Sequence, residues 1–539
     1  MVRRMGKEMA KPEGEADVSE QKKKIQQSER NDGNGYCGDD DDDMRSSWPF
    51  ASCYTATTLL LAGFAVFLRI LVGLHSYSGK GTPPKFGDYE AQRHWMEITI
   101  HTPVGDWYRN TTENDLGWWG LDYPPLTAYQ SYVHGLVVQA FDPEAVALRS
   151  SRGYETYGSK LLMRWTVLSS DILVFFPAAL CFVNVFYAHR GAKQRIWALA
   201  VILLQPALII IDHGHFQFNC ISLGLAVGAA AAVVSRHELL ACVLFSLSLN
   251  HKQMSMYYAP AFFAYLLGKA LQRRNPLLRV FQLGCTVILT FTICWWPFLR
   301  SSGAASEVLS RLAPLHRGLY EDYVANFWCG TTMLFKWKHL FAQPTLAKLA
   351  LGATISAALP SMVQQIRAPS RKGFLYAMLN SSFAFYFFAY QVHEKSILLP
   401  IIPASLLALE EPQVLQWLVP YSMFSMLPLL RRDDLLIPYL ALMWLFFLIP
   451  RPPTQSQKIS GASARPEVSN LRFFLSFSVL GASVLHLMYF ILQAPKRYPF
   501  LFEAFIMSYS FAHFVPLALY TNWKQWTISV DVATKQKVS

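Results

Sequence analysis

Long apolar runs, separated by short polar segments, recur along the chain after residue 50. Val280–Phe298 and Phe374–Tyr390 contain no charged residue, and Tyr54–Val72 contains only Arg69. Runs of about 20 residues match the hydrocarbon layer of a bilayer, which is about 30 Å thick. The pattern therefore predicts an all-α, polytopic membrane helix bundle of about fourteen transmembrane helices. The expected spans lie near residues 54–74, 163–187, 196–212, 219–234, 238–250, 256–270, 278–298, 346–366, 374–390, 396–410, 413–430, 434–450, 471–493 and 500–521.

One further apolar run is too short to assign by length alone. Residues 126–141 lie between Pro124-Pro125 and Asp142-Pro143, and about sixteen residues are marginal for a span. Counting this run as a span would reverse the side on which every later loop lies. We therefore interpret it as an interfacial or re-entrant helix inside one long first loop, residues 75–160. An additional span here, compensated by a missed span later, is the alternative.

Basic residues sort the loops between the two sides of the membrane. Four loops carry basic clusters, within Arg190–Arg195, Lys269–Arg279, Arg367–Lys372 and Arg451–Arg465. All four fall on one side, which the positive-inside rule identifies as cytoplasmic. The pairs Arg431-Arg432 and Lys496-Arg497 fall on the other side. Both chain ends are then cytosolic, and the first long loop is lumenal.

The two ends of the chain differ in composition from the region between them. Residues 1–50 are polar and highly charged, which predicts a disordered cytosolic tail. Residues 51–530 form the membrane domain. Residues 531–539 form a second cytosolic tail, in which Lys535 and Lys537 make a dilysine-type retrieval signal for the endoplasmic reticulum. Asn110 begins a glycosylation sequon in the lumenal loop, whereas the Asn380 sequon lies inside an apolar run and is expected to be unusable.

Composition narrows the class of protein. Hydrophobic residues make up 53% of the chain and charged residues 16%, against about 25% charged in an average soluble domain. These values exclude a disordered protein, a coiled coil and an ordinary soluble enzyme. Cytoplasmic loops account for the net charge of +12, so no nucleic-acid partner is expected. The eight cysteines show no CxxC or zinc spacing, and no nucleotide-binding motif occurs, so neither a metal nor a cofactor is expected.

Six polar clusters reach the lumenal ends of the expected spans. They are Gly87–Trp95, Leu121–Pro125, Asp212–Asn219, Asn250–Gln253, His316–Tyr323 and Gln391–Lys395. Ionisable side chains at membrane depth are costly and usually functional. Carboxylates can remove a proton, and neighbouring cations can stabilise a departing phosphate, which suits glycosyl transfer from a lipid phosphate. A transporter or flippase, and a receptor or scaffold without chemistry, are the alternatives. The pair Asp433-Asp434 is interpreted as a solvated loop.

Five segments carry motifs that resemble the glucosyltransferase family of lipid-linked oligosaccharide assembly. They are Gly87–Trp95, Leu121–Leu126, Asp212–Gln217, Gly318–Asp322 with Ala325–Cys329, and Gln391–Ser396. The resemblance covers roughly residues 50–530. Asp88-Tyr89-Glu90 and the Glu321-Asp322 pair favour the branch of the family that adds the first glucose. The branch that adds the second glucose is the alternative.

The resemblance implies a GT-C fold in the endoplasmic reticulum membrane, with the first lumenal loop over the site. It implies inverting transfer of glucose from dolichyl phosphate glucose to the terminal mannose of the dolichyl-pyrophosphate-linked nine-mannose, two-N-acetylglucosamine oligosaccharide. The product is an α-1,3 linkage made for protein N-glycosylation. Asp88 matches the family's catalytic aspartate. The residues expected to bind the donor phosphate and sugar are His393, Lys395, Arg93, His213, His215 and Glu394. Those expected to position the acceptor sugar are Asp122, Tyr123, Glu321 and Asp322.

Overall fold

The computed structural model describes residues 53–312, 323–453 and 466–538. Every regular element in these ranges is a helix, so the prediction of an all-α fold is confirmed. Contacts divide the chain after Leu59, and Leu60–Ser539 forms one compact unit. The predicted disordered tail, residues 1–50, lies outside the described residues.

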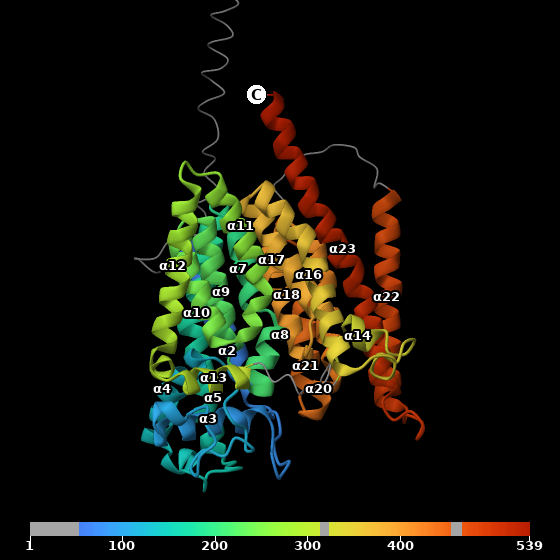
Figure 1. Ribbon diagram of the computed structural model, residues 1–539. Coiled ribbons are helices and arrows are strands. Elements are labelled where there is room, and N and C mark those ends of the chain that lie inside the picture. Colours follow the sequence, from blue (N-terminus) through green and yellow to red (C-terminus); the bar gives the residue numbers. More distant parts are fainter. Residues whose placement is uncertain (1–52, 313–322, 454–465, 539) are drawn as a thin grey trace, which may run out of the picture. The chain divides into compact units, whose positions relative to one another are not determined.

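Figure 1 colours the helices in chain order from blue to red, and their bounds are given in three groups, residues 53–216, 219–312 and 327–538. The first group is α2 (Cys53–Gly73), α3 (Asp88–His101), η1 (Val104–Asp106), α4 (Pro125–Phe141), η2 (Pro143–Val146), α5 (Tyr157–Ser170), η3 (Asp171–Phe175), α6 (Phe176–Phe186), α7 (Ala192–Leu203), α8 (Pro206–Ile209) and η4 (Ile210–Phe216). The second is α9 (Asn219–Val234), α10 (Glu238–His251), η5 (Gln253–Tyr258), α11 (Ala259–Leu271), α12 (Pro276–Trp295), η6 (Trp296–Arg300) and α13 (Ser302–Leu312). The third is α14 (Phe327–Gly330), α15 (Trp337–Leu340), α16 (Gln343–Arg367), α17 (Arg371–Phe388), η7 (Glu394–Ile397), α18 (Leu398–Leu406), α19 (Pro412–Ser425), α20 (Leu427–Arg432), α21 (Leu436–Leu448), α22 (Pro466–Ile491) and α23 (Leu501–Val538).

Helices occupy each of the segments that the apolar runs predicted. Six helical segments of the described residues are long and apolar enough to cross a membrane. They are Cys53–Gly73, Tyr157–Phe186, Ala192–Phe216, Pro276–Arg300, Gln343–Arg367 and Leu501–Ile528. The protein is therefore a polytopic helical membrane protein. Several other predicted spans are shorter apolar helices, such as α9 and α10.

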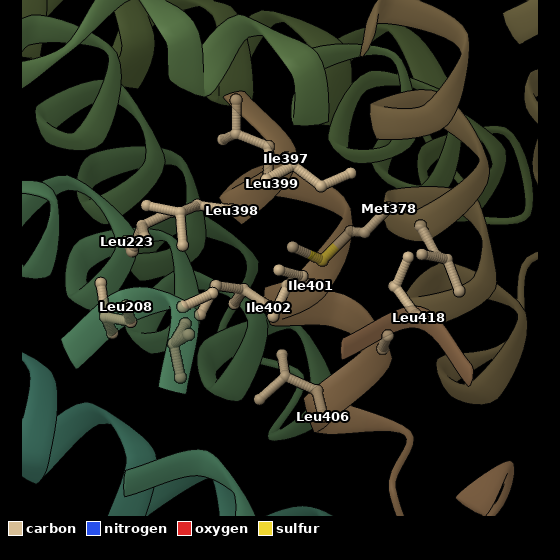
Figure 2. Close-up of a cluster of buried hydrophobic side chains, with 14 of the residues drawn as sticks. Leu208, Leu223, Met378, Ile397, Leu398, Leu399, Ile401, Ile402, Leu406 and Leu418 are labelled. Atoms are coloured by element: carbon tan, nitrogen blue, oxygen red, sulfur yellow. The ribbon is translucent and has the colours of Figure 1, made fainter. Parts of the chain in front are cut away.

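The core of the bundle is formed by helices that are buried on all sides. Every residue of α18 is buried, and α17 is buried along almost its whole length. Figure 2 shows Ile401 and Ile402 of α18 among Leu208, Leu223, Met378 and Leu418, which come from α8, α9, α17 and α19. By contrast, α12 and α16 leave large apolar side chains exposed, including Phe281, Ile288 and Ile355. An exposed apolar surface of this kind is suited to lipid contact.

The first long loop packs its own two helices together. In Figure 1, α3 and α4 (blue) lie side by side near the ends of α10 and α12, and α4 contacts all three. Ala128, Gly135 and Val138 of α4 are buried, while Val133 and Phe141 face outward. At 17 residues, α4 is not among the six candidate spans. Its assignment as an interfacial or re-entrant helix stays a prediction.

Candidate active site

Asp88 is the first residue of α3, and its place is fixed by a close backbone contact. A Cβ atom on Gly87 would lie 2.6 Å from both the carbonyl carbon and Oγ of Ser78. Only glycine permits this approach. The Asp88 backbone N–H donates to Ser78 Oγ at 3.2 Å. The start of α3 is therefore anchored to the segment that follows α2.

Three side chains converge on one oxygen of the Asp88 carboxylate. Lys395 Nζ donates to Asp88 Oδ2 at 2.6 Å and Gln217 Nε2 donates to it at 2.5 Å. His215 Nε2 lies 2.9 Å from the same oxygen. Among the described residues nothing donates to the other oxygen, Oδ1, and a quarter of the Asp88 side chain is exposed (25%). Within the described part of the chain, the protein thus holds one oxygen of Asp88 and leaves the other without a hydrogen-bond donor.

His215 reaches Asp88 from a π-helical segment. η4 ends at Phe216, whose φ of 88° lies in the left-handed region that non-glycine residues rarely adopt. π-Helical turns and left-handed residues of this kind recur at functional sites. The opposite ring nitrogen of His215, Nδ1, pairs with Asp433 Oδ2. The imidazole is therefore held between two carboxylates.

A second chain of polar contacts orients Gln217. Lys252 Nζ donates to Gln217 Oε1 at 2.7 Å and to Asn219 Oδ1 at 2.9 Å. Asn219 Nδ2 in turn donates to Asp212 Oδ1 at 2.8 Å. Because Gln217 Oε1 accepts from Lys252, its amide nitrogen is directed at Asp88.

The charges of this cluster keep Asp88 ionised. Burial raises the pKa of the Asp88 carboxyl, but the Lys395 ammonium and His215 outweigh burial and hold this pKa well below its usual range. Burial likewise lowers the pKa of Lys395, yet the Asp88 carboxylate raises it further, so the net shift is upward. The two groups form a stable ion pair at neutral pH.

Part of the expected acceptor motif lies beside Lys252. The Lys252 ammonium stands 4.9 Å from the centre of the Tyr123 ring, a cation–π contact. Gln253 Nε2 donates to the backbone oxygen of Asp122 at 3.1 Å. The Asp122-Tyr123 segment of the first loop is therefore tied to the segment that follows α10, next to the Gln217 contacts.

Two residues expected to bind the donor instead make other contacts. Arg93 is fully buried and donates to Glu90 at 2.7 Å, to Glu97 at 2.8 Å, and to Ser151 at 2.5 Å. His213 Nε2 lies 3.0 Å from Asp171 Oδ2, which also pairs with Arg69. Neither bonds to Asp88 or Lys395 among the described residues. Their assignment to the donor stays a prediction.

A cavity of about 400 Å³ is lined by sequence neighbours of two cluster residues. Glu394 and Arg432 line it, and they immediately precede Lys395 and Asp433 in the sequence. The other polar lining comes from Tyr323, Ser425, Arg431, Tyr489 and Glu503. His393 is the N-cap of η7, beside Glu394. Glu321 and Asp322 lie outside the described residues.

Sequence reasoning did not find the role of Asp433. The interpretation of Asp433-Asp434 as a solvated loop is wrong for Asp433, which is 4% exposed and pairs with His215. It is consistent with Asp434, which is exposed. The position of this pair in the predicted topology could have indicated a role in the site, because the pair falls on the same side of the bundle as the six polar clusters.

The fold and this cluster define an integral membrane enzyme with an ionised carboxylate beside a lysine and a histidine. A model of the ALG6, ALG8 glycosyltransferase family matches residues 65–520. The chain is 56% identical over 490 residues to an Arabidopsis thaliana protein named probable dolichyl pyrophosphate Man9GlcNAc2 alpha-1,3-glucosyltransferase, covering 90% of this chain and 92% of that protein. A Dictyostelium discoideum protein of the same name is 42% identical over 503 residues, covering 89% and 97%. The Gallus gallus dolichyl pyrophosphate Man9GlcNAc2 alpha-1,3-glucosyltransferase is 40% identical over 494 residues, covering 87% and 96%.

The chain belongs to the ALG6, ALG8 glycosyltransferase family. It is an α-1,3-glucosyltransferase of lipid-linked oligosaccharide assembly. The family expected from the sequence motifs is thereby confirmed. Membership also weighs against the transporter and scaffold alternatives.

Proposed function

We propose that this enzyme moves glucose from dolichyl phosphate glucose to the terminal mannose of dolichyl-pyrophosphate-linked Man9GlcNAc2, forming an α-1,3 linkage. The names of the related proteins support this acceptor. The assignment of dolichyl phosphate glucose as the donor is supported by the motif resemblance. It is also supported by the segment that contains His393 and Lys395, whose Glu394 lines the cavity. The reaction takes place at the lumenal side of the endoplasmic reticulum membrane, in a GT-C fold whose fourteen spans include the shorter apolar helices.

The chemistry is a single displacement with inversion. The acceptor hydroxyl oxygen attacks the anomeric carbon of glucose while the bond to the donor phosphate breaks from the opposite face. The hydroxyl proton passes to Asp88 Oδ1, the oxygen to which no described residue donates. Three donors on Oδ2 hold the carboxylate plane, so that Oδ1 keeps a fixed direction. This one-sided arrangement is the observation that carries the proposal.

Lys395 couples the base to the leaving group. Its ammonium pairs with Asp88 in the absence of substrate. As the donor phosphate gains negative charge, the same ammonium stabilises it, with His393 beside it. Movement of the Lys395 ammonium towards the phosphate weakens its ion pair with Asp88. The Asp88 carboxylate then becomes a stronger base. Glu394, Asp122, Tyr123, Glu321 and Asp322 then position sugar hydroxyls, and Arg93 and His213 remain candidates for the donor.

The decisive experiment replaces the base without changing its shape. Asp88→Asn removes the ability to accept a proton, and we expect kcat to fall by about a thousandfold or more. The assay uses purified enzyme, both lipid substrates and a mass check for one added hexose. Asp434→Asn, an exposed site, is the matched control and should keep normal activity. Near-normal transfer by Asp88→Asn would refute the base assignment.

The same assay separates the alternatives. An enzyme that adds the second glucose would accept only the acceptor that already carries one glucose. A transporter or flippase would move lipid between leaflets and add no hexose to either acceptor.

A further inference from the structure

Asp433 is held rigidly at the end of α20. The N–H of Leu435 donates to the Leu430 oxygen at 2.8 Å, and the N–H of Asp434 donates to the Arg431 oxygen at 3.2 Å. Asp434 has a φ of 57°, and Leu430 and Leu435 are both fully buried. These are the bonds, the left-handed residue and the apolar pair of a Schellman C-cap. The backbone that carries the Asp433 carboxylate is therefore fixed.

The cap also packs directly on the segment that carries His215. A Cβ atom on Gly214 would lie 3.2 Å from Leu435 Cδ1, so the cap and η4 are already in close contact at that point. Asp433 Oδ2 pairs with His215 Nδ1, and both side chains are almost wholly buried. Little freedom is left for either group to turn away from the other.

The charges around the imidazole show why it needs this partner. The ring has a carboxylate oxygen at each nitrogen, Asp433 at Nδ1 and Asp88 at Nε2. Because a carboxylate oxygen only accepts, each contact is a hydrogen bond when the facing nitrogen carries a proton. The Lys395 ammonium lies 3.1 Å from Nε2, so it opposes a positive charge on the ring. The Asp433 carboxylate offsets this opposition.

We propose that Asp433 is a positioning residue for the glucosyl transfer, which acts through His215 to hold Asp88 with its Oδ1 directed at the acceptor. This inference rests on the proposed role of Asp88. Asp433 itself takes no proton from the substrate and binds neither sugar. Without it, the ring turns, and the bond from His215 to Asp88 Oδ2 weakens.

The test is a double-mutant cycle on the full-length enzyme, with dolichyl phosphate glucose and the Man9GlcNAc2 lipid. Asp433→Asn and His215→Gln should each lower kcat about ten- to a hundredfold, with KM for both substrates changed less than about twofold. Both substitutions interrupt the same chain of contacts, from Asp433 through His215 to Asp88. The double variant should therefore be no slower than the slower single variant. Asp434→Asn is the neighbouring control and should lie within about twofold of the native enzyme.

The outcomes of this test can be distinguished from those that test Asp88 as the base. Full activity of Asp433→Asn, or additive losses in the double variant, would overturn the positioning role. A thermal unfolding curve in detergent reports whether each variant folds. If Asp433→Asn does not fold, normal kcat of His215→Gln would overturn the proposal, and a lowered kcat with unchanged KM supports it. Activity of Asp88→Asn would refute the proposed function instead.

Discussion

The ammonium of Lys395 governs when Asp88 can accept a proton. Removing this cation by Lys395→Met raises the pKa of Asp88, because the charge that holds it down is lost while burial remains. A carboxyl with a raised pKa becomes protonated at higher pH, so the acid limb of the kcat profile should move to higher pH. We also expect the maximal kcat to fall about a hundredfold, because the departing phosphate loses a cation.

The conservative variant separates charge from packing in this experiment. Lys395→Arg keeps the cation, and its acid limb should stay close to that of the native enzyme. The measurement is kcat as a function of pH for the three proteins under saturating lipid substrates. Superimposed profiles for Lys395→Met and native enzyme would show that Lys395 does not control Asp88.

The sequence identified some site residues and missed others for physical reasons. The motifs predicted Asp88, His215 and Lys395, which the structure brings together. Asp433 lies 218 residues from His215 in the chain, and its exposed neighbour is also an aspartate, so only tertiary packing tells the two apart. The ion pairs of Arg93 could have been predicted from the sequence, because Glu90 and Glu97 lie three and four residues from it along one helix.

The α3 helix depends on the glycine that precedes it. Gly87→Ala places a Cβ atom 2.6 Å from the Ser78 carbonyl carbon and 2.7 Å from the Gly79 backbone nitrogen. Backbone atoms cannot turn aside as a side chain can, so the start of α3 must shift and carry Asp88 with it. We expect a loss of about 1–3 kcal/mol in stability, as for other overpacked sites, and a fall in kcat of about a hundredfold, as for small misplacements of reacting groups.

Gly105→Ala is the matched control, since it lies in the same loop and its added Cβ atom meets nothing within 4 Å. Thermal unfolding in detergent and the transfer assay measure both effects. Equal stability and activity of the two alanine variants would show that the close approach at Gly87 is not required.

Helix positions were more predictable than helix geometry. The run near 219–234 coincides with α9, because its apolar residues are bounded by polar segments on both sides. The π-helical turns η3 and η4 were not predicted from the same pattern. A shift of one residue in the backbone hydrogen bonds leaves the apolar pattern almost unchanged, yet it determines where His215 and Asp171 point.

At the scale of the whole molecule, opposite charges tie together three loops that the basic clusters assign to the cytoplasm. Glu410 Oε1 accepts from Arg190 Nη2 at 3.0 Å, and Glu410 Oε2 accepts from Lys372 Nζ at 2.5 Å. These contacts join the segment after α6, the first turn of α17 and the segment after α18. The Asp88 cluster occupies other loops, which the charge sorting assigns to the lumen.

This topology predicts which of the two glycosylation sequons is used. Asn110 is exposed in the first loop, whereas Asn380 is 1% exposed and its Nδ2 donates to Gln525 Oε1 at 2.8 Å. We expect a glycan at Asn110 alone, because only a side chain that is both lumenal and accessible can be modified. Endoglycosidase treatment of the protein from microsomes should then increase its gel mobility. Thr112→Ala destroys the sequon and should abolish this shift, whereas Thr112→Ser preserves it. Digestion of the 75–160 loop by protease added to sealed microsomes would place the Asp88 site in the cytosol and overturn the topology.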